Sequence, residues 1–154
     1  MLPAHSLKIA LVEPEIPQNT GNIARLCAAT GVQLHLVRPL GFFLSDKHFK
    51  RAGMDYLQAV PMTIHDDLPA LFRVIDVDPF VLTSGLQGMP HCSMRIERNC
   101  WILLGKESAG LPALLLEAHP GRIAQIPMVE GTRGLNLSTA AGIMVYEALR
   151  QAGH

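Results

Sequence analysis

The chain has 154 residues, of which 49% are hydrophobic and 17% charged, and its formal net charge is zero. This length and composition predict one compact domain over residues 1–154 and leave little room for disordered segments. A protein that holds nucleic acid by bulk electrostatics usually carries a basic excess, so binding of a polynucleotide would here require a local basic patch.

Several classes of protein are disfavoured by what the sequence lacks. No apolar run approaches the ~20 residues of a membrane span, and the first residues lack the layout of a signal peptide, so we expect a cytoplasmic protein without membrane contact. The three cysteines, Cys27, Cys92 and Cys100, are odd in number and widely spaced, which disfavours a disulfide framework or a C-x-x-C zinc site. No H-x-x-x-H pair occurs among the seven histidines, so we expect no metal.

The N-terminal part of the chain predicts a β-strand, a helix and a second strand. Residues 7–12 are a mostly apolar run that ends before two prolines, as a buried strand does. Residues 19–22 offer helix caps, residues 23–30 have helical spacing, and Gly31 would end that helix. The run 34–37 then predicts a strand parallel to the first, with a right-handed crossover.

The most basic segment of the chain is a short predicted helix over residues 45–53. It carries Lys47, His48, Lys50 and Arg51. These side chains can form an ordinary solvated helix face or a patch that binds phosphate groups, and the pattern alone does not decide between the two.

The remainder of the chain continues to alternate predicted strands and helices. The predicted strands are residues 59–64, placed at a sheet edge because of Pro61, then 79–84, 100–105 and 122–126; the predicted helices are residues 66–75, 113–119 and 137–151. Five or six strands alternating with helices predict an α/β fold with a mostly parallel sheet.

Three loops follow predicted strand ends, where open α/β sheets bind ligands: residues 83–88, 105–110 and 126–138. The chain has no G-x-G fingerprint, no phosphate loop in the correct order and no G-x-S-x-G elbow, which excludes the familiar dinucleotide, nucleotide and hydrolase signatures. The third loop leads into a helix with a regular apolar stripe, and Asn136 and Ser138 are suitable N-cap residues.

Three segments, taken together, resemble a known family. Residues 19–25, 104–112 and 126–138 resemble, in this order, the three motifs of the SPOUT methyltransferases. Residues 13–23, 51–56 and 145–151 more narrowly resemble the TrmL branch, which methylates the 2′-oxygen of the wobble cytidine or uridine, position 34, in tRNA. The similarity covers about residues 7–151.

The resemblance implies a SPOUT α/β fold, with a C-terminal deep trefoil knot whose loops hold S-adenosylmethionine (SAM). Its contacts would be Leu82, Thr83, Gly105, Ile126, Met128, Gly134, Leu135 and Asn136. Adenine requires an apolar slot and backbone hydrogen bonds, which glycines and strand ends can supply. Relatives often have serine where this chain has Gly134, so only a backbone contact is expected there.

By the same resemblance, catalysis would involve Arg25, Asn19 and Glu107. The arginine is often assigned to activation of the ribose hydroxyl, but a guanidinium group holds its proton too tightly to be a good general base. We therefore expect Arg25 to grip the target phosphate or ribose, and Asn19 to shape the same loop. Glu107 would order the central loop or assist proton removal, and we favour ordering. The expected RNA contacts are Arg25, Lys47, Lys50, Arg51, Arg133 and Tyr146.

The family also implies a homodimer. The last helix, which carries Tyr146, would form the interface, and Arg25 of one subunit could approach SAM bound to the other. Two copies of the basic helix would offer tRNA a larger positive surface despite the zero net charge. Two alternatives remain: the same chemistry at another tRNA or rRNA position, and a non-enzymatic, flavodoxin-like binding module.

Overall fold

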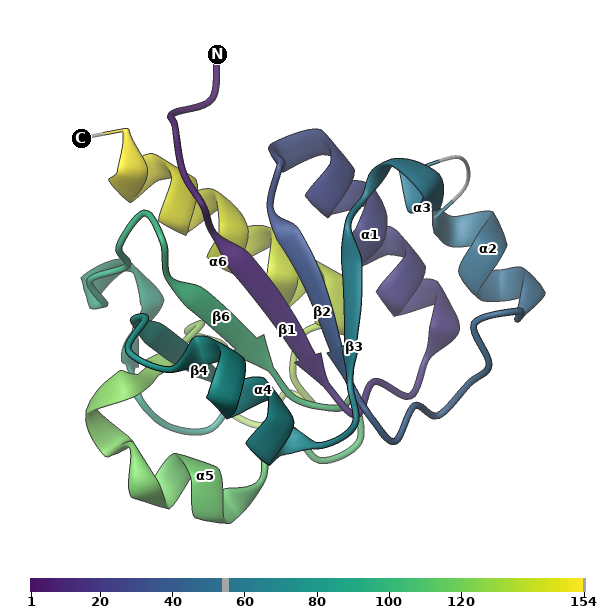
Figure 1. Ribbon diagram of the computed structural model, residues 1–154. Coiled ribbons are helices and arrows are strands. Elements are labelled where there is room, and N and C mark those ends of the chain that lie inside the picture. Colours follow the sequence, from purple (N-terminus) through teal and green to yellow (C-terminus); the bar gives the residue numbers. More distant parts are fainter. Residues whose placement is uncertain (54–55, 154) are drawn as a thin grey trace.

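A computed structural model describes residues 1–53 and 56–153 of the chain (Figure 1). Within these residues one sheet has the strand order β3-β2-β1-β6-β4-β7-β5, and all its paired strands are parallel. The strands are β1 (Lys8–Val12), β2 (Gln33–Val37), β3 (Met62–His65), β4 (Phe80–Ser84), β5 (Met89–Pro90), β6 (Trp101–Leu104) and β7 (Ile123–Gln125).

Helices cover both faces of this sheet. They are α1 (Pro17–Thr30), α2 (Lys47–Gly53), α3 (Tyr56–Ala59), α4 (Leu68–Ile75), α5 (Ala113–Ala118) and α6 (Leu137–Ala152), with short 3₁₀ turns η1 (His91–Ser93) and η2 (Pro120–Arg122). Figure 1 shows α1 and α6 behind the sheet and α4 and α5 in front of it, while α2 and α3 lie outside α1. The predicted parallel α/β sheet flanked by helices is confirmed. The knotted threading stays a prediction.

Alternating side chains of the central strands build the two halves of the core. On β1, Ile9 and Leu11 pack in the cluster that contains the buried residues of α1 and α6, whereas Ala10 and Val12 pack in the cluster of α4 and α5. All four are nearly inaccessible to solvent. This period of two is the reason that strands covered on both faces read as continuous apolar runs.

Helix α1 begins at Pro17 rather than near Ile23, so the predicted capping segment 19–22 lies inside the helix. Its N-cap residue, Ile16, makes no side-chain capping bond. The Glu107 carboxylate instead accepts the backbone N–H of Ile16, from 91 positions away. The predicted start of this helix was wrong because this acceptor is distant in the chain. At the other end, Gly31 takes the left-handed conformation (φ 76°), as predicted.

Two short elements, α3 and β5, were not predicted, and one strand was misplaced. The sheet has β5 in addition to the five or six strands predicted, and β5 has only two residues, too few for a hydrophobic pattern. The strand predicted over 59–64 is β3, Met62–His65, and Ala59 instead ends helix α3. Its predicted place at a sheet edge is confirmed. Part of the 51–56 motif, residues 54 and 55, lies outside the described residues.

No helix in the described part of the chain is both long and apolar enough to span a lipid bilayer.

Candidate active site

A cleft of about 470 Å³ lies beyond the carboxyl ends of β4, β6 and β7. Its walls come from the three loops that the sequence singled out, together with the start of α1. The volume is within the roughly 300–1,000 Å³ of typical small-molecule sites. Apolar side chains contribute to its lining: Leu104, Leu111, Leu116, Ile126, Met128, Leu135 and Leu137.

The central loop can fold back on itself only because residue 105 is glycine. A Cβ at this position would overlap the Gly110 carbonyl carbon and the Leu111 nitrogen. Lys106 and Gly110 form a backbone bridge that closes the loop, and Gly110 has a positive φ of 70°. The 105–110 loop is therefore a compact wall of the cleft with its backbone close to the cavity.

Glu107 ties this central loop to the start of α1. Its two carboxylate oxygens accept the backbone N–H groups of Glu15 at 2.8 Å and Ile16 at 3.1 Å, and the Asn19 side-chain amide at 3.3 Å. A carboxylate near a helix N-terminus also has a favourable interaction with the helix dipole. Glu107 thus accepts three hydrogen bonds that hold the central loop to the start of α1. Its role in the reaction stays a prediction.

Asn19, which is bonded to Glu107 of the central loop, is also bonded to the third loop. Its Oδ1 accepts a hydrogen bond from Asn136 Nδ2 at 2.9 Å, and Asn136 Oδ1 accepts the Ser138 backbone N–H at 2.9 Å. Because Glu107 can only accept, the amide of Asn19 must turn its NH₂ toward Glu107, and this choice fixes the orientation of Asn136 as well. The chain Glu107–Asn19–Asn136 thus joins all three motifs and caps α6.

A second pair of contacts holds the same loops together. The Glu15 carboxylate accepts the Ser108 backbone N–H at 2.9 Å and the Ser108 hydroxyl at 2.7 Å. The Ser108 hydroxyl and then its N–H lower the pKa of Glu15, against a smaller opposing effect of burial. Lys106 Nζ lies 3.2 Å from Glu13 Oε2. Glu13 has a positive φ of 53°, a strained conformation for a non-glycine residue.

The structure brings most of the predicted cofactor residues together. Thr83, Gly105, Ile126, Met128, Gly134, Leu135 and Asn136 all line the cleft. The Leu82 side chain does not, because it is fully buried in the core. A Cβ at Gly134 would meet nothing within 4 Å, but φ there is +105°, which favours glycine. Their assignment to SAM stays a prediction.

Other lining residues were not predicted. They include Ile16, Ser84, Gly85, Leu86, Gln87, Ser108 and Thr132. The signal that could have found several of them was their position in loops that follow strand ends, since the segment 83–88 was already recognised as such a loop.

Arg25 does not line the cleft of its own chain. Residue 25 lies six positions after Asn19 on α1, about 9 Å along the axis and about 240° around it for a regular helix. Its side chain is exposed, and its guanidinium carbon is 5.7 Å from the ring centroid of Tyr56. This distance is within the range of a cation–π contact. The Arg25 side chain therefore faces α3 rather than the cleft.

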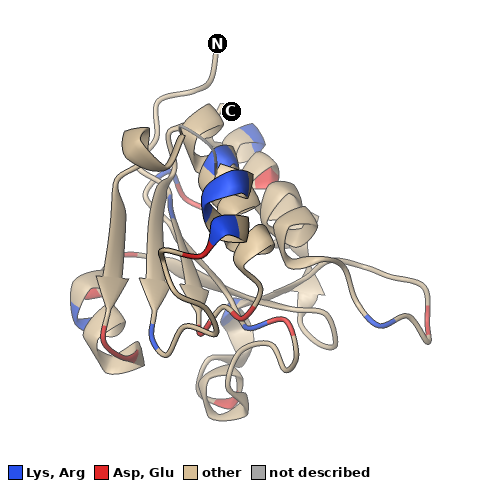
Figure 2. Ribbon diagram, turned by 90° about the vertical axis from the view of Figure 1, so that its right-hand side faces the viewer, with Lys and Arg blue, Asp and Glu red and all other residues tan. Residues whose placement is uncertain are grey.

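The predicted basic patch lies on the helix that packs outside α1. Helices α1 and α2 approach so closely that a Cβ on Gly21 would be 2.5 Å from Ala52 Cβ. The side chains of Lys47, Lys50 and Arg51 are exposed, and Figure 2 shows that α2 presents its blue segments on one face of the molecule. Arg133 lines the cleft, whereas Tyr146, 54% exposed on α6, does not.

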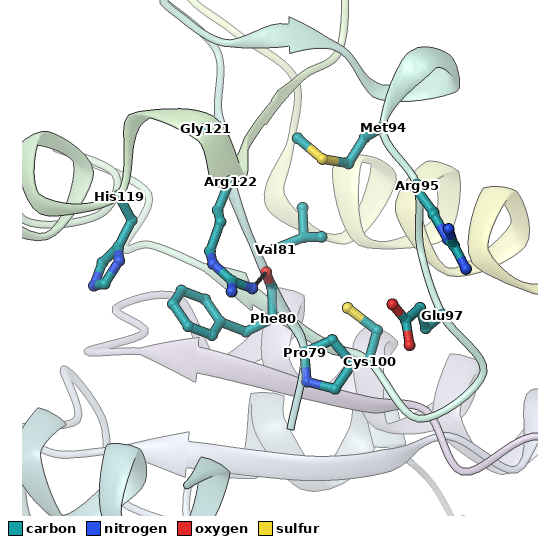
Figure 3. A pocket seen from close by; sticks show the side chains of 10 residues that line it. All are labelled: Pro79, Phe80, Val81, Met94, Arg95, Glu97, Cys100, His119, Gly121 and Arg122. Atoms are coloured by element: carbon teal, nitrogen blue, oxygen red, sulfur yellow. Dashed lines mark hydrogen bonds between the residues drawn. The ribbon is translucent and has the colours of Figure 1, made fainter. Parts of the chain in front are cut away.

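A second cavity, of about 480 Å³, lies where β4, β6 and β7 begin (Figure 3). There the Arg122 guanidinium is 4.4 Å from the Phe80 ring centroid and donates to the Phe80 carbonyl oxygen at 3.3 Å. Because open parallel sheets bind ligands at the carboxyl ends of their strands, the first cleft is the better candidate for the active site.

Among the described residues, the buried thiols and the potential metal ligands form no second reactive site. Burial raises the pKa of the Cys27 thiol and of the Cys100 thiol to about 12 each, so neither is a thiolate nucleophile at neutral pH. Within residues 1–53 and 56–153, His, Cys, Asp and Glu side chains form no group of three or more that could hold a metal ion.

Comparison with known proteins gives consistent matches over nearly the whole chain. A tRNA (cytidine(34)-2'-O)-methyltransferase of Yersinia pestis is 45% identical over 156 residues, which cover 96% of this chain and 95% of that protein. A solved structure described as giving insight into the 2-OH methylation of C/U34 on tRNA is 40% identical, with a TM-score of 0.91 and 97% of each chain covered. An AdoMet-bound rRNA methyltransferase from Sinorhizobium meliloti is 27% identical, with a TM-score of 0.84, 97% of this chain covered and 58% of that chain.

A comparison of the chain with protein-family models identifies its family directly. The model of the SpoU rRNA Methylase family matches residues 6–146. This match confirms the resemblance to the SPOUT methyltransferases that the three motifs carry. The chain belongs to the SpoU rRNA methylase family.

Proposed function

We propose that this protein transfers the methyl group of SAM to the ribose 2′-oxygen of nucleotide 34, a cytidine or uridine, in tRNA. The observation that carries the proposal is the convergence of three distant motifs on one cleft, joined by Glu107, Asn19 and Asn136. The relatives named for this reaction share nearly the full length of this chain at more than 40% identity, which supports the same substrate.

The cleft fits SAM in size and in chemistry. An adenine ring needs an apolar slot, which Leu104, Ile126 and Met128 can form, and backbone hydrogen bonds, which the exposed loop 131–136 and the compact loop 105–110 can offer. When bound, SAM supplies a methyl group on a positively charged sulfur. The contribution of this chain is then mainly to hold the acceptor oxygen in line, since positioning provides a large share of such catalysis.

The side chains near the cleft divide into those that build it and those that remain free for RNA. Glu107 and Asn19 already bond to each other and to the loops, so their role is to fix the walls. Arg133 is exposed on the third loop and would bind an RNA phosphate or ribose. Arg25 presents the planar fork of N–H donors of a guanidinium and would grip the phosphate next to the target ribose.

A homodimer is part of this proposal because the cleft of one chain lacks Arg25. Exposed apolar side chains lie near the cleft and on α6: Ile16 is 42% exposed, Leu135 is 44% exposed and Tyr146 is 54% exposed. Burial of such a patch stabilises association. A partner bound through this face would bring its own Arg25 toward the cleft, and the exposed position of Arg25 allows this.

The tRNA surface would combine the cleft with the basic face of α2. Lys47, Lys50 and Arg51 are exposed and form no ion pair with any described residue within 4.0 Å. They are therefore available to RNA phosphates. Two copies of this face in a dimer would give a basic surface that the neutral overall charge conceals.

The direct test is nucleoside mass spectrometry of unmodified tRNA treated with the protein and SAM. We expect 2′-O-methylcytidine or 2′-O-methyluridine at position 34, and a Lys47→Ala, Lys50→Ala, Arg51→Ala variant should give much less product. A 2′-O-methyl group at another position, or on rRNA alone, would contradict the assigned target. Absence of SAM binding in calorimetry would contradict methyl transfer and favour a non-enzymatic binding module.

The dimer is tested by complementation between two inactive variants. Arg25→Ala should bind SAM but transfer no methyl group, and Met128→Glu should fail to bind SAM because it places a carboxylate in the apolar wall. Equal mixing, with dissociation and reassociation, should restore roughly a quarter of wild-type activity, because half of the dimers are mixed and each has one complete site. No restored activity, or a monomer in sedimentation, would contradict a shared site.

A further inference from the structure

Most polar side chains that line the cleft are already committed to hydrogen bonds within the chain. On the central loop, Lys106, Glu107 and Ser108 all bond to the segment that precedes α1. Asn19 and Asn136 bond to each other. These five side chains therefore hold the walls of the cleft and have limited capacity for a ligand.

The hydroxyl groups of the cleft are committed in the same way. Thr83 Oγ1 donates to the Leu103 carbonyl at 2.9 Å, and Thr132 Oγ1 donates to the Val129 carbonyl at 2.8 Å. Ser84 Oγ accepts the backbone N–H of Leu86 at 3.2 Å.

Two polar side chains of the cleft make no such hydrogen bond with the described residues. Among the described residues, Gln87 and Arg133 line the cleft, are exposed, and make neither a side-chain hydrogen bond nor an ion pair with the part of the chain that the structure describes. They lie on different loops, one after β4 and the other before α6. Arg133 suits an anion. Gln87 presents a neutral amide, which suits the edge of a base.

The loop that carries Gln87 is anchored at both ends. Gln125 Nε2 donates to the Gly85 carbonyl at 3.3 Å, and the Leu86 N–H is bound by Ser84. At the far end, Gly88 has a φ of +118°, and a Cβ there would lie 2.5 Å from the Ile123 carbonyl oxygen, so only glycine allows this close approach. Gln87 thus projects from a fixed support, as a recognition residue requires.

Resting on the proposed function, we infer that Gln87 reads the pyrimidine base of nucleotide 34. A glutamine amide has a carbonyl acceptor and an NH₂ donor side by side. Cytosine presents its N4 amino donor beside the N3 acceptor, and uracil presents its O4 acceptor beside the N3–H donor, in reversed order. Rotation of the amide by half a turn matches either base, so one side chain accepts both pyrimidines.

This assignment divides the recognition of RNA between the two free side chains. Arg133 binds backbone groups, which are the same for every nucleotide and therefore position the substrate. Gln87 contacts the edge of the base, which is the part that differs between nucleotides. The same side chain accepts cytidine and uridine because a half-turn of the amide exchanges the positions of its donor and its acceptor.

The test compares two tRNAs that differ only in cytidine or uridine at position 34, in wild-type protein and in two variants. Gln87→Glu has only acceptors, so kcat/KM should shift about tenfold toward cytidine, whose N4 group donates. Gln87→Lys has only donors and should shift about tenfold toward uridine, whose O4 accepts. Gln33→Glu and Gln33→Lys, at an exposed position at the start of β2, should leave the ratio unchanged.

Calorimetry with SAM separates base reading from cofactor binding, and also reports correct folding of each variant. We expect both Gln87 variants to bind SAM as the wild type does. An unchanged cytidine-to-uridine ratio in both variants, or a loss of SAM affinity with no change in that ratio, would overturn the inference. A wild-type protein inactive on both tRNAs would instead overturn the proposed function on which it rests.

Discussion

Asn136 Nδ2 donates a hydrogen bond to Asn19 Oδ1 at 2.9 Å, although 117 positions separate the two residues in the chain. The bond joins helix α1 to the loop that precedes α6, and Asn19 is only 5% exposed. Water therefore has little access to replace a missing partner. The shape of the cleft depends on two side-chain amides whose orientations are both set by the Glu107 carboxylate.

Replacement of Asn19 by aspartate should disrupt this arrangement. Asn19→Asp removes the amide donor and places a second carboxylate at the 3.3 Å distance that now separates Asn19 Nδ2 from Glu107 Oε1. The free energy of unfolding should fall by about 1–3 kcal/mol, the cost of a buried unsatisfied group, and SAM should bind more weakly. Urea unfolding and calorimetry measure both effects.

The matched control is Gln18→Glu, the same amide-to-carboxylate change on the neighbouring, exposed residue of α1. Its effect should remain within about 0.5 kcal/mol, as for most surface substitutions. If Asn19→Asp proved as stable as Gln18→Glu and bound SAM normally, the amide chain would not hold the cleft together.

Gly21→Ala should separate the two helices that carry the predicted RNA contacts. The new Cβ would lie 2.5 Å from Ala52 Cβ and 2.8 Å from the Phe49 carbonyl oxygen, so α2 must move away from α1. We expect the free energy of unfolding to fall by about 1–3 kcal/mol, which is typical of overpacking, and tRNA to bind more weakly in a filter-binding assay.

The control for this change is the helical glycine Gly142 of α6, where a Cβ would meet nothing within 4 Å. Gly142→Ala should raise the free energy of unfolding by up to about 1 kcal/mol, because alanine is the better helix former. Equal effects of the two substitutions would show that α1 and α2 are not tightly packed.

Much of this architecture could be predicted because its signals are local. Gly31 ends α1 and Asn136 caps α6 where the sequence placed them, and strand periodicity located the central sheet. The start of α1 could not be predicted, since its capping carboxylate, Glu107, comes from the opposite half of the chain. Strand β5 was not predicted because two residues carry no periodicity.

The candidate site, too, could be predicted from the sequence only in part. Its three loops were identifiable as segments that follow strands, and Gly105 and Asn136 as parts of motifs. That Arg25 faces away from its own cleft is a consequence of helix phase, and it emerges only once α1 is known to begin at Pro17. The availability of Gln87 depends on which neighbours are already bonded, and no sequence pattern contains that information.

Charge reversal on α2 should weaken RNA binding in a salt-dependent manner. Lys50→Glu with Arg51→Glu removes two exposed cations from the face shown in Figure 2. The slope of log K against log salt concentration should become less steep by about 0.7–0.9 for each RNA phosphate that the variant no longer neutralises, while SAM affinity should not change. Titrations of tRNA at several salt concentrations measure the slope.

Arg73→Glu on α4 is the control, because it makes the same kind of charge change on the opposite face of the sheet. It should leave the slope unaltered. If Arg73→Glu changed the slope by half as much as the double variant, in proportion to its single charge reversal, RNA would sense only the total charge and α2 would be an ordinary solvated face.

A buried histidine pair should make the protein sensitive to acid. His35 Nδ1 and His65 Nε2 lie 2.9 Å apart on the neighbouring strands β2 and β3, and the His35 ring packs against Trp101. One ring donates the hydrogen between the two nitrogens, so the accepting ring must be neutral. Burial, followed by the charges of His65 and Lys8, lowers the pKa of His35 to about 4, and burial also lowers the pKa of His65.

The direction of the effect follows from proton binding in the two states. An unfolded histidine has a pKa of about 6.5, so between about pH 6.5 and 4 the unfolded chain binds more protons than the folded one. Stability should therefore be level above about pH 6.5 and fall as the pH decreases toward 4, by a total on the order of 2 kcal/mol. Urea unfolding at pH values from 7.5 to about 4 would measure this decrease.

The variant His35→Leu, His65→Leu replaces both partners with apolar groups and should flatten the curve, whereas His48→Gln, at an exposed position on α2, should not. If the double variant became unstable in acid as steeply as the wild type, the acid sensitivity would arise from carboxylates such as Asp78, whose pKa is lowered by its hydrogen bonds from Lys8 and Trp101, rather than from the buried rings.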